Sequence, residues 1–407
     1  MSKLPVTLGQ ILKGKNGLYE IIEALKTNTV FKAAILGSTS EEIHPGAQQL
    51  AVIKTETDES MNYVLNRERN NYELPHMASC KTIRALRDVI GFDSQTPLEP
   101  QCIVFEWMDQ DLRTVPYSRF RSKPGLPRVI ARSVLETLAF LKETYGAFHS
   151  DINPNNILLS NVDSACPIVK VGDLGNMLRE GYDDTRIQSL PTRAPEVWRG
   201  LGCFHSSDVW SLGATLTYWL AQRLVFGAGD KIIDGNTEAW CIAKIIRLVG
   251  PISPPVNEAF LDEFSLARAL EKEEYEDPET GEMKQFITVG TVRQELERIG
   301  GVPQDLIEFI EYLLVIDHTK RPTAREALGH PVWFMQGREP LDGSSLDGLL
   351  DNSASSRAAA VPSSIDPDGA VVFKENLNLW PSEQEEGSRS QSTEASRPSP
   401  VSTKPLP

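Results

Sequence analysis

Two polar side chains that could serve one reacting group, Asp151 and Asn156, lie five positions apart. Pro154 restricts the segment between them, and an apolar run at 157–159 follows directly. A carboxylate held in this way can orient an attacking hydroxyl and accept its proton. A carboxamide oxygen can bind Mg²⁺. The spacing therefore indicates a loop that holds both groups at one reacting centre.

Two more charged residues could take part in the same chemistry. Lys54 ends an apolar run at 50–53, and Asp173 lies in a short Asp-Leu-Gly sequence 17 residues after Asn156. A lysine at the end of a strand is usually a solvated surface charge, and an isolated Asp-Leu-Gly is usually a turn. Their significance comes from their order and spacing relative to Asp151.

Several segments resemble the protein kinase superfamily. Residues 149–156 resemble the catalytic loop H-R-D-x-x-x-x-N, residues 51–54 the strand V-A-I-K, and residues 173–175 the D-F-G segment with leucine for phenylalanine. Further on, residues 194–196 read A-P-E and residues 208–213 fit D-x-W-S-x-G. The matches extend from about Tyr19 to Phe334 and most resemble the cyclin-dependent, mitogen-activated and SR-protein kinases. They imply an α+β, bilobal fold with a small β-rich N-lobe and a larger α-helical C-lobe.

The resemblance implies ATP and Mg²⁺ as cofactors and phosphoryl transfer to serine or threonine of a protein substrate. Asp151 is then the catalytic base, and Lys54 pairs with the phosphates of ATP. Asn156 and Asp173 are the implied metal ligands. Catalysis of phosphoryl transfer consists mainly of positioning and charge neutralisation, which these four side chains could supply.

The family also has a glutamate that pairs with the lysine, and a helix over residues 61–74 is expected to carry it. Glu68 and Glu73 are both candidates. We favour Glu68, because it can share one helical face with Leu65 and Tyr72, whereas Glu73 lies at the predicted end of the helix. Glu68 therefore completes the predicted catalytic set.

The resemblance further implies an adenine site between the lobes. An apolar run that ends at Phe105, the expected gatekeeper, leads into the hinge. Glu106 and Met108 are expected to offer backbone groups to the base, and Leu158 to form the floor beneath it. The predicted cofactor-binding residues are Val30, Ala51, Lys54, Glu106, Met108 and Leu158.

Other implied contacts fix the segments around the catalytic loop. Arg321 is expected to form a buried ion pair with Glu196, and removal of one partner of such a pair typically costs about 3–5 kcal/mol. Ser189 stands where the family has a hydroxyl that contacts the catalytic aspartate. Asp208 is expected to hold the backbone of the catalytic loop.

Three departures from the family pattern bear on activity. Ser150 replaces the arginine of the catalytic loop, so activation by a phosphate on the following segment is less expected. Asn153 replaces a lysine near the transferred phosphate. The loop between the first two strands has Glu23, Leu25 and Asn28 at the positions of glycines, which normally let backbone amides approach phosphate oxygens.

These departures leave two alternatives open. A pseudokinase would keep the fold and act as a scaffold or regulatory binding module. A small-molecule kinase is suggested because residues 149–151 also resemble the H-G-D loop of aminoglycoside and choline kinases. Those relatives lack the A-P-E and D-x-W-S-x-G elements that occur here. Transfer to a protein is therefore the favoured function.

The elements that must position these groups follow from hydrophobic periodicity. Ile130, Val134, Leu138 and Leu141 predict an amphipathic helix over 128–145 that leads to the catalytic loop. An apolar run at 208–220 predicts a helix buried in the large lobe. Strand-like runs predict an antiparallel sheet. These runs cover residues 19–25, 29–36, 50–54, 83–90 and 101–112.

The predicted elements divide the chain into an N-terminal lead at 1–16, an N-lobe at 17–107, a C-lobe at 108–335 and a tail at 336–407. The lead is polar and is expected to be loosely attached. The tail is rich in Ser, Pro, Gly and acidic residues, which predicts disorder. Within it, the apolar stretch 371–380 could dock on the kinase or on a partner. The acidic stretch 271–282 is expected to be a solvated loop.

Composition limits the partners. The 407 residues carry a net charge of −15, which argues against nucleic acid because phosphate binding needs an excess of Lys and Arg. Five scattered cysteines in no disulfide or metal-binding pattern predict a reducing, cytoplasmic or nuclear compartment. The absence of a secretory signal or a long apolar run predicts no membrane association. A monomer is expected.

Overall fold

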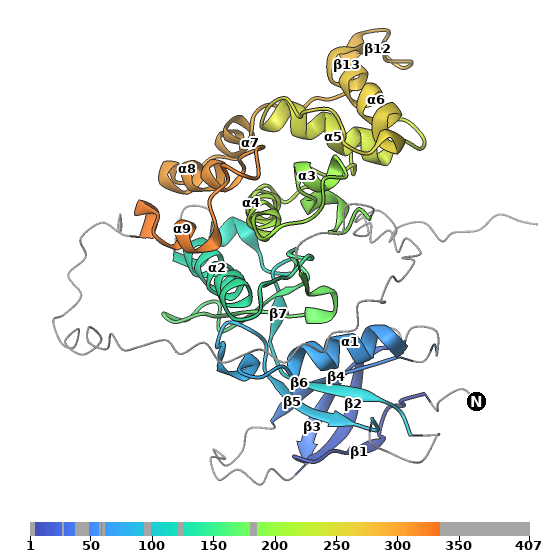
Figure 1. Ribbon diagram of the computed structural model, residues 1–407, viewed down its shortest axis with the longest axis vertical. Helices are drawn as coiled ribbons and strands as arrows, with labels where there is room; N and C mark the ends of the chain where they lie inside the picture. The colour runs from blue at the N-terminus through green and yellow to red at the C-terminus, as the bar shows by residue number, and fades with distance from the viewer. Residues whose placement is uncertain are drawn as a thin grey trace, which may run out of the picture.

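The computed structural model describes residues 5–26, 28–36, 49–56, 58, 62–92, 99–120, 125–179 and 185–333. Figure 1 shows a β-sheet with the helix labelled α1 (Asn62–Tyr72), drawn in blue, and a larger lobe made mainly of helices. This arrangement confirms the predicted α+β, bilobal fold. The tail and its apolar stretch at 371–380 lie outside the described residues.

The N-lobe is a six-stranded antiparallel sheet in the order β1-β2-β3-β4-β6-β5. Its strands are β1 (Ile11–Lys13), β2 (Leu18–Lys26), β3 (Val30–Leu36), β4 (Leu50–Thr55), β5 (Leu86–Ile90) and β6 (Cys102–Glu106). β4 lies between β3 and β6, so Lys54 is held between Val30 and Ile103. Helix α1 (Asn62–Tyr72) packs on the sheet through Leu65 and Tyr72.

Strand β1 corrects the prediction that residues 1–16 form a loose lead. It pairs with β2, and Leu12 is buried in the same core as Tyr19. On β5, the Asp88 carboxylate accepts hydrogen bonds from the Asn16 amide (2.7 Å) and the Tyr19 hydroxyl (3.0 Å). The lead was misread because a three-residue strand is too short to show periodicity.

We expect Leu12→Ala to lower the free energy of unfolding by about 2–5 kcal/mol, because it removes a buried side chain from the N-lobe core. The matched control is Ile11→Ala on the same strand. Ile11 is 55% exposed, so its substitution is expected to cost about 0.5 kcal/mol or less. Denaturant unfolding measures both. Equal stabilities of the two variants would show that β1 does not belong to the folded lobe.

The C-lobe is built around helix α4 (His205–Ala221), which is buried over most of its length. Figure 1 shows α4, in green, among the other helices of this lobe. These helices are α2 (Gly125–Tyr145), α3 (Pro195–Trp198), α5 (Thr237–Leu248), α6 (Leu261–Lys272), α7 (Val292–Ile299), α8 (Gln304–Leu313) and α9 (Ala324–Leu328). No helix in the described part of the chain has both the length and the apolar character needed to cross a membrane.

Two small sheets at the junction of the lobes bring the polar loops together. β8 (Ala147–Phe148) pairs with β11 (Leu178–Arg179). β9 (Ile157–Ser160) pairs with both β7 (Gln110–Asp111) and β10 (Ile168–Val171). The loop at 149–156 connects β8 to β9, and the segment at 172–177 connects β10 to β11. Because these strands pair with each other, the two loops lie side by side.

The acidic stretch 271–282 is more ordered than the predicted solvated loop. Helix α6 continues to Lys272, and a hairpin of β12 (Glu274–Glu276) and β13 (Met283–Gln285) follows. The connection is closed by a hydrogen bond from the Asp277 amide to the Glu282 carbonyl (2.9 Å). Most of these side chains are exposed, which is why the composition alone indicated a loop.

Candidate active site

A cavity of about 480 Å³ lies between the lobes, where β4, α1 and the two polar loops meet. Asp151 adjoins it through a hydrogen bond from the Asn156 amide nitrogen to its carboxylate (3.0 Å). Predicted site residues that line the cavity are Val30, Lys54, Glu68, Asn156, Leu158 and Asp173. The fold thus gathers most of the predicted residues in one place. Their individual roles in catalysis stay predictions.

Lys54 is held between two carboxylates. Its Nζ lies 2.6 Å from Glu68 Oε2 and 3.3 Å from Asp173 Oδ2. Burial by itself lowers the pKa of Lys54, but Asp173 and Glu68 together outweigh it and raise the pKa above its ordinary value. The lysine is therefore a fixed positive charge beside the cavity. Glu73, the other candidate, instead pairs with Arg69 at 3.4 Å.

Helix α1 is tied to the segment after Asp173. Asn71 donates a hydrogen bond to the Leu174 carbonyl (2.7 Å), and Arg67 donates one to the Asn176 side chain (2.7 Å). The Leu174 side chain is fully buried in the core that also contains the apolar face of α1. These contacts hold Glu68 toward the cavity.

The Asp151 carboxylate is fixed by three neutral donors. Ser189 Oγ lies 2.6 Å from Oδ1, Asn153 Nδ2 lies 2.8 Å from the same oxygen, and Asn156 Nδ2 lies 3.0 Å from Oδ2. The Ser189 contact is the one expected from the family pattern. Asn153, which replaces a lysine, acts here on the orientation of Asp151. Asn156 also points its Nδ2 to Asp151, so the side-chain oxygen of Asn156 is left available as a metal ligand.

Asp208 holds the backbone of the catalytic loop from helix α4. Its carboxylate accepts hydrogen bonds from the amides of His149 (2.6 Å) and Ser150 (3.0 Å). Burial raises the pKa of Asp208 to about 7, against the effect of these two amides. Ser150 itself has a positive φ of 65° and donates to the Asn176 carbonyl (2.5 Å). Ser150 therefore links the two polar loops.

The described part of the segment before helix α3 is held by hydrogen bonds from Gln188 and Arg193. Gln188 Nε2 donates to Ser211 Oγ (2.9 Å), and its Oε1 accepts from the Ala194 amide (2.9 Å). Arg193 donates to the carbonyls of Ile187 (3.0 Å) and Gln188 (3.0 Å). Residues 180–184 lie outside the described ranges.

Glu196 and Arg321 form the buried ion pair expected from the sequence. Two parallel contacts join them, Nη1 to Oε1 at 2.7 Å and Nη2 to Oε2 at 2.8 Å. Arg321 also donates to the Val315 carbonyl (2.8 Å), and Ser207 donates to Glu196 (2.5 Å). The pair fixes the end of the segment that carries Ser189.

The base side of the cavity corrects one predicted residue. Side chains alternate along β4, so Ala51 and Ile53 face the sheet core, whereas Val52 and Lys54 face the cavity. Val52, not Ala51, therefore lines the cavity. The prediction was one position out of register. Leu158 lies on the other side of the same cavity, as expected.

The hinge residues Glu106 and Met108 are not among the described residues that line the cavity. The Glu106 carbonyl accepts a hydrogen bond from Arg84 Nε (3.0 Å), and its carboxylate accepts from Lys170 (2.5 Å) and the Ala85 amide (2.6 Å). Met108 is buried. The hinge carbonyl expected to meet adenine is thus already in contact with a side chain.

Sequence reasoning missed two cations that line the cavity, Lys26 and Arg84. Lys26 ends β2 beside the loop without glycines. Arg84 precedes β5, and nothing in an alternating run at 83–90 distinguishes it from a surface arginine. Only the fold shows that both basic side chains reach the cavity.

The residues present fit Mg²⁺ and a triphosphate. Mg²⁺ prefers oxygen ligands and usually takes one or two from the protein and the rest from phosphate and water. Asp173 and Asn156 offer such oxygens, while Lys54 and Lys26 offer positive charge for phosphate. Within the described ranges, no group of three or more His, Cys, Asp or Glu side chains could hold a metal alone. A Mg²⁺ ion held by Asp173 and Asn156 would take its other oxygen ligands from phosphate and water.

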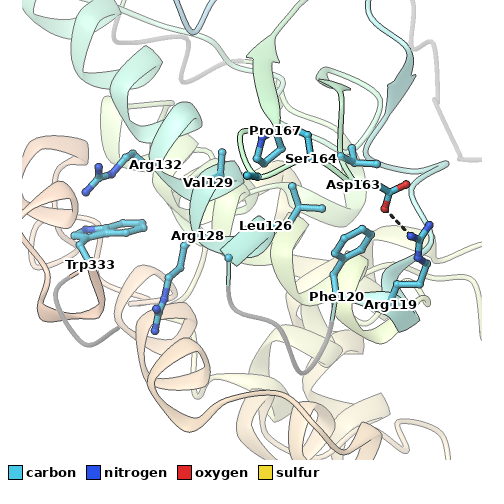
Figure 2. Close-up of a pocket in the computed structure, with 13 residues that line it drawn as sticks. Arg119, Phe120, Leu126, Arg128, Val129, Arg132, Asp163, Ser164, Pro167 and Trp333 are labelled. Carbon is cyan, nitrogen blue, oxygen red and sulfur yellow. Dashed lines mark hydrogen bonds and ion pairs between the residues drawn. The ribbon is translucent and has the colours of Figure 1, made fainter. Parts of the chain in front are cut away.

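A second cavity of about 800 Å³ lies on the C-lobe, beside the start of α2 (Figure 2). Arg119 at its edge pairs with Asp163 (2.5 Å), and Arg132 lies over the ring of Trp333 at 5.4 Å. None of the predicted catalytic residues is among the described residues that line it. The cavity between the lobes is therefore the candidate active site.

We expect Glu68→Gln to reduce phosphoryl transfer by about 10²-fold, because a small displacement of a positioning group can have an effect of that size. The substitution weakens the contact that positions Lys54. The matched control, Glu73→Gln, changes an exposed glutamate of the same helical region that pairs with Arg69. Initial rates of transfer measure both variants. If Glu73→Gln were the more damaging variant, the assignment of Glu68 would be wrong.

Comparison with known proteins agrees with this geometry. The two-lobed fold and the Lys54, Glu68 and Asp173 cluster define a protein of the kinase class. A family model described as protein kinase domain matches residues 36–334. The chain therefore belongs to the protein kinase family.

Similar curated proteins carry kinase names. Serine/threonine-protein kinase SSN3 of Yarrowia lipolytica is 29% identical over 259 residues, which cover 58% of this chain and 59% of that protein. Serine/threonine-protein kinase AFC1 of Arabidopsis thaliana is 26% identical over 276 residues, covering 58% and 56%. SSN3 of Scheffersomyces stipitis is 26% identical over 364 residues, covering 78% and 77%. The chain thus spans less than two thirds of the length of the first two relatives.

Proposed function

We propose that this protein transfers a phosphoryl group from a magnesium-bound nucleoside triphosphate to serine or threonine of a protein substrate. ATP is the donor predicted from the sequence. The observation that carries the proposal is the convergence of Lys54, Glu68 and Asp173 on one cavity, next to Asp151 and Asn156. The names of the relatives, serine/threonine-protein kinases, support the same activity.

Each side chain has a physical task in this reaction. Asp151 is fixed by three donors and can orient the substrate hydroxyl and accept its proton. Lys54 holds a positive charge for the phosphates, and Asp173 and Asn156 offer ligands to the metal. When bound, Mg²⁺ neutralises charge on the transferred group. The polar set needed for transfer is therefore complete without the missing lysine at position 153.

The two alternatives are less well supported. A pseudokinase is suggested by the loop without glycines, Asn153 and Ser150, but Lys26 at the end of β2 and Thr29 in this loop line the cavity and can face phosphate. A small-molecule kinase is disfavoured by the Glu196–Arg321 pair, which fixes the segment after Asp173 in the manner of protein kinases. Protein phosphorylation in a reducing, cytoplasmic or nuclear compartment fits five cysteines that form no disulfide with one another.

The proposal is tested with the full chain, labelled ATP or GTP, Mg²⁺ and a mixture of basic proteins, beside an Asp151→Asn variant. Label on serine or threonine, lost in the variant, is the expected result. Phosphoamino acid analysis of the product identifies the acceptor. Absence of transfer from both nucleotides, in a folded protein that still binds nucleotide, would overturn the proposed activity and favour a scaffold.

A further inference from the structure

Arg84 is one of the residues that line the candidate nucleotide cavity. Its backbone is fixed, because the Arg84 amide donates to the Val171 carbonyl (2.8 Å) across the junction of the lobes. Its side chain passes Gly172, where an added Cβ would lie 3.8 Å from Arg84 Cδ. The guanidinium carbon lies 5.2 Å from the ring centre of Phe105. The backbone contact with Val171 and the packing against Gly172 and Phe105 thus fix the position of the Arg84 side chain.

The hydrogen bonds of Arg84 leave donors available. Nε donates to the Glu106 carbonyl (3.0 Å). In the part of the chain that the structure describes, neither terminal nitrogen of Arg84 has a hydrogen-bond partner, and no carboxylate lies within ion-pair distance. A guanidinium has five N–H donors and no acceptor. Among the described residues, Arg84 therefore lines the cavity with terminal N–H groups that donate to no other group.

This arrangement changes which base the cavity suits. The Glu106 carbonyl is the acceptor expected to pair with the exocyclic amino group at position 6 of adenine. Here that acceptor already binds Arg84, and further donors lie beside it. Adenine would bring its amino donor toward these donors. A base with an oxygen at position 6 would bring an acceptor, and arginine pairs well with the O6 and N7 acceptors of guanine.

We propose that Arg84 selects a purine nucleotide with a 6-oxo group, the class that includes guanine and hypoxanthine nucleotides, over an adenine nucleotide. The inference rests on the proposed function, because it takes this cavity to be the nucleotide site. It leaves the triphosphate contacts and the metal ligands unchanged and replaces the predicted base. Arg84 is then the residue that determines nucleotide specificity.

Binding of IDP and ADP with Mg²⁺ to the full chain tests the proposal by calorimetry. These probes carry the same phosphates and sugar, differ at position 6 and its neighbouring ring nitrogen, and lack the transferred phosphate. We expect IDP to bind about tenfold more tightly, within the discrimination that one good arginine–base contact provides. Binding of ADP that equals or exceeds that of IDP would overturn the proposal.

Arg84→Val is expected to remove the preference for IDP, while Arg87→Val, at an exposed arginine of β5, is expected to keep it. If Arg84→Val kept the wild-type ratio of IDP affinity to ADP affinity, the proposal would be overturned. Thermal unfolding shows whether Arg84→Val folds. If it does not fold, the ratio of IDP affinity to ADP affinity in the wild-type protein decides the question, and Arg84→Lys serves as the second variant. Arg84→Lys is expected to weaken the preference, because lysine lacks the planar pair of donors.

The outcomes separate this inference from the proposed function. Transfer of phosphate to protein without a preference for IDP would overturn the inference and support the function. A preference for IDP without any transfer would support the inference and overturn the function. Failure of both nucleotides to bind would overturn the inference.

Discussion

Asp151→Asn is expected to reduce phosphoryl transfer to protein by about 10²–10⁴-fold, which is the usual contribution of a general base. The substitution keeps the size of the side chain but removes the charge that orients the substrate hydroxyl. Nucleotide affinity should change little, because Asp151 reaches the cavity only through Asn156. A loss of rate without loss of binding is therefore the expected pattern.

Single-turnover transfer rates and nucleotide affinity, measured on the same preparation, check this result. Asp163→Asn is the matched control, because Asp163 is exposed, pairs with Arg119 and is not among the described residues that line the cavity between the lobes. The control should transfer at the wild-type rate. An Asp151→Asn variant with more than half of the wild-type rate would show that another group orients the hydroxyl.

Arg321→Leu is expected to lower the free energy of unfolding by about 3–5 kcal/mol, because it leaves the buried Glu196 without its partner. Burial alone would raise the pKa of Glu196, but Arg321 outweighs it and lowers the pKa. A carboxyl whose pKa is lower in the folded state than in the unfolded state stabilises the fold at pH values above its unfolded-state pKa. This contribution is lost as the pH falls through the lowered value. The wild-type protein should therefore lose stability in acid.

Denaturant unfolding at neutral pH measures the effect of Arg321→Leu. Arg325→Leu is the matched control, since Arg325 is 65% exposed and its pair with Glu143 is expected to contribute about 0–1 kcal/mol. The double variant Glu196→Leu/Arg321→Leu should recover part of the lost stability, because it removes both charges. If Arg321→Leu and Arg325→Leu were equally stable, the buried ion pair between Glu196 and Arg321 would not hold the segment.

The sequence predicted those parts of the site that have both a local pattern and a fixed spacing. The helical period placed Glu68 on the face of α1 that packs on the sheet, and the structure brings it to Lys54. The order of the segments around Asp151 and Asp173 likewise predicted two loops at one centre. Both results depend on patterns repeated over several residues.

Features set by a single residue or by tertiary contact could not be predicted in this way. A shift of one residue in a strand exchanges its two faces, which is why Ala51 was chosen in place of Val52. Arg84 lies in an ordinary alternating run, and only its pairing across the lobes carries it into the cavity. Strand β1 is too short to have a period of its own.

The hydrogen bonds of Gln188 and Arg193 have a consequence for control in the cell. Because Gln188 and Arg193 already hold the described part of this segment, we expect its shape not to depend on phosphorylation by another enzyme. We expect the freshly folded chain to be competent at once. The kinase activity in the cell would then be set by the rates at which the protein is synthesised and degraded.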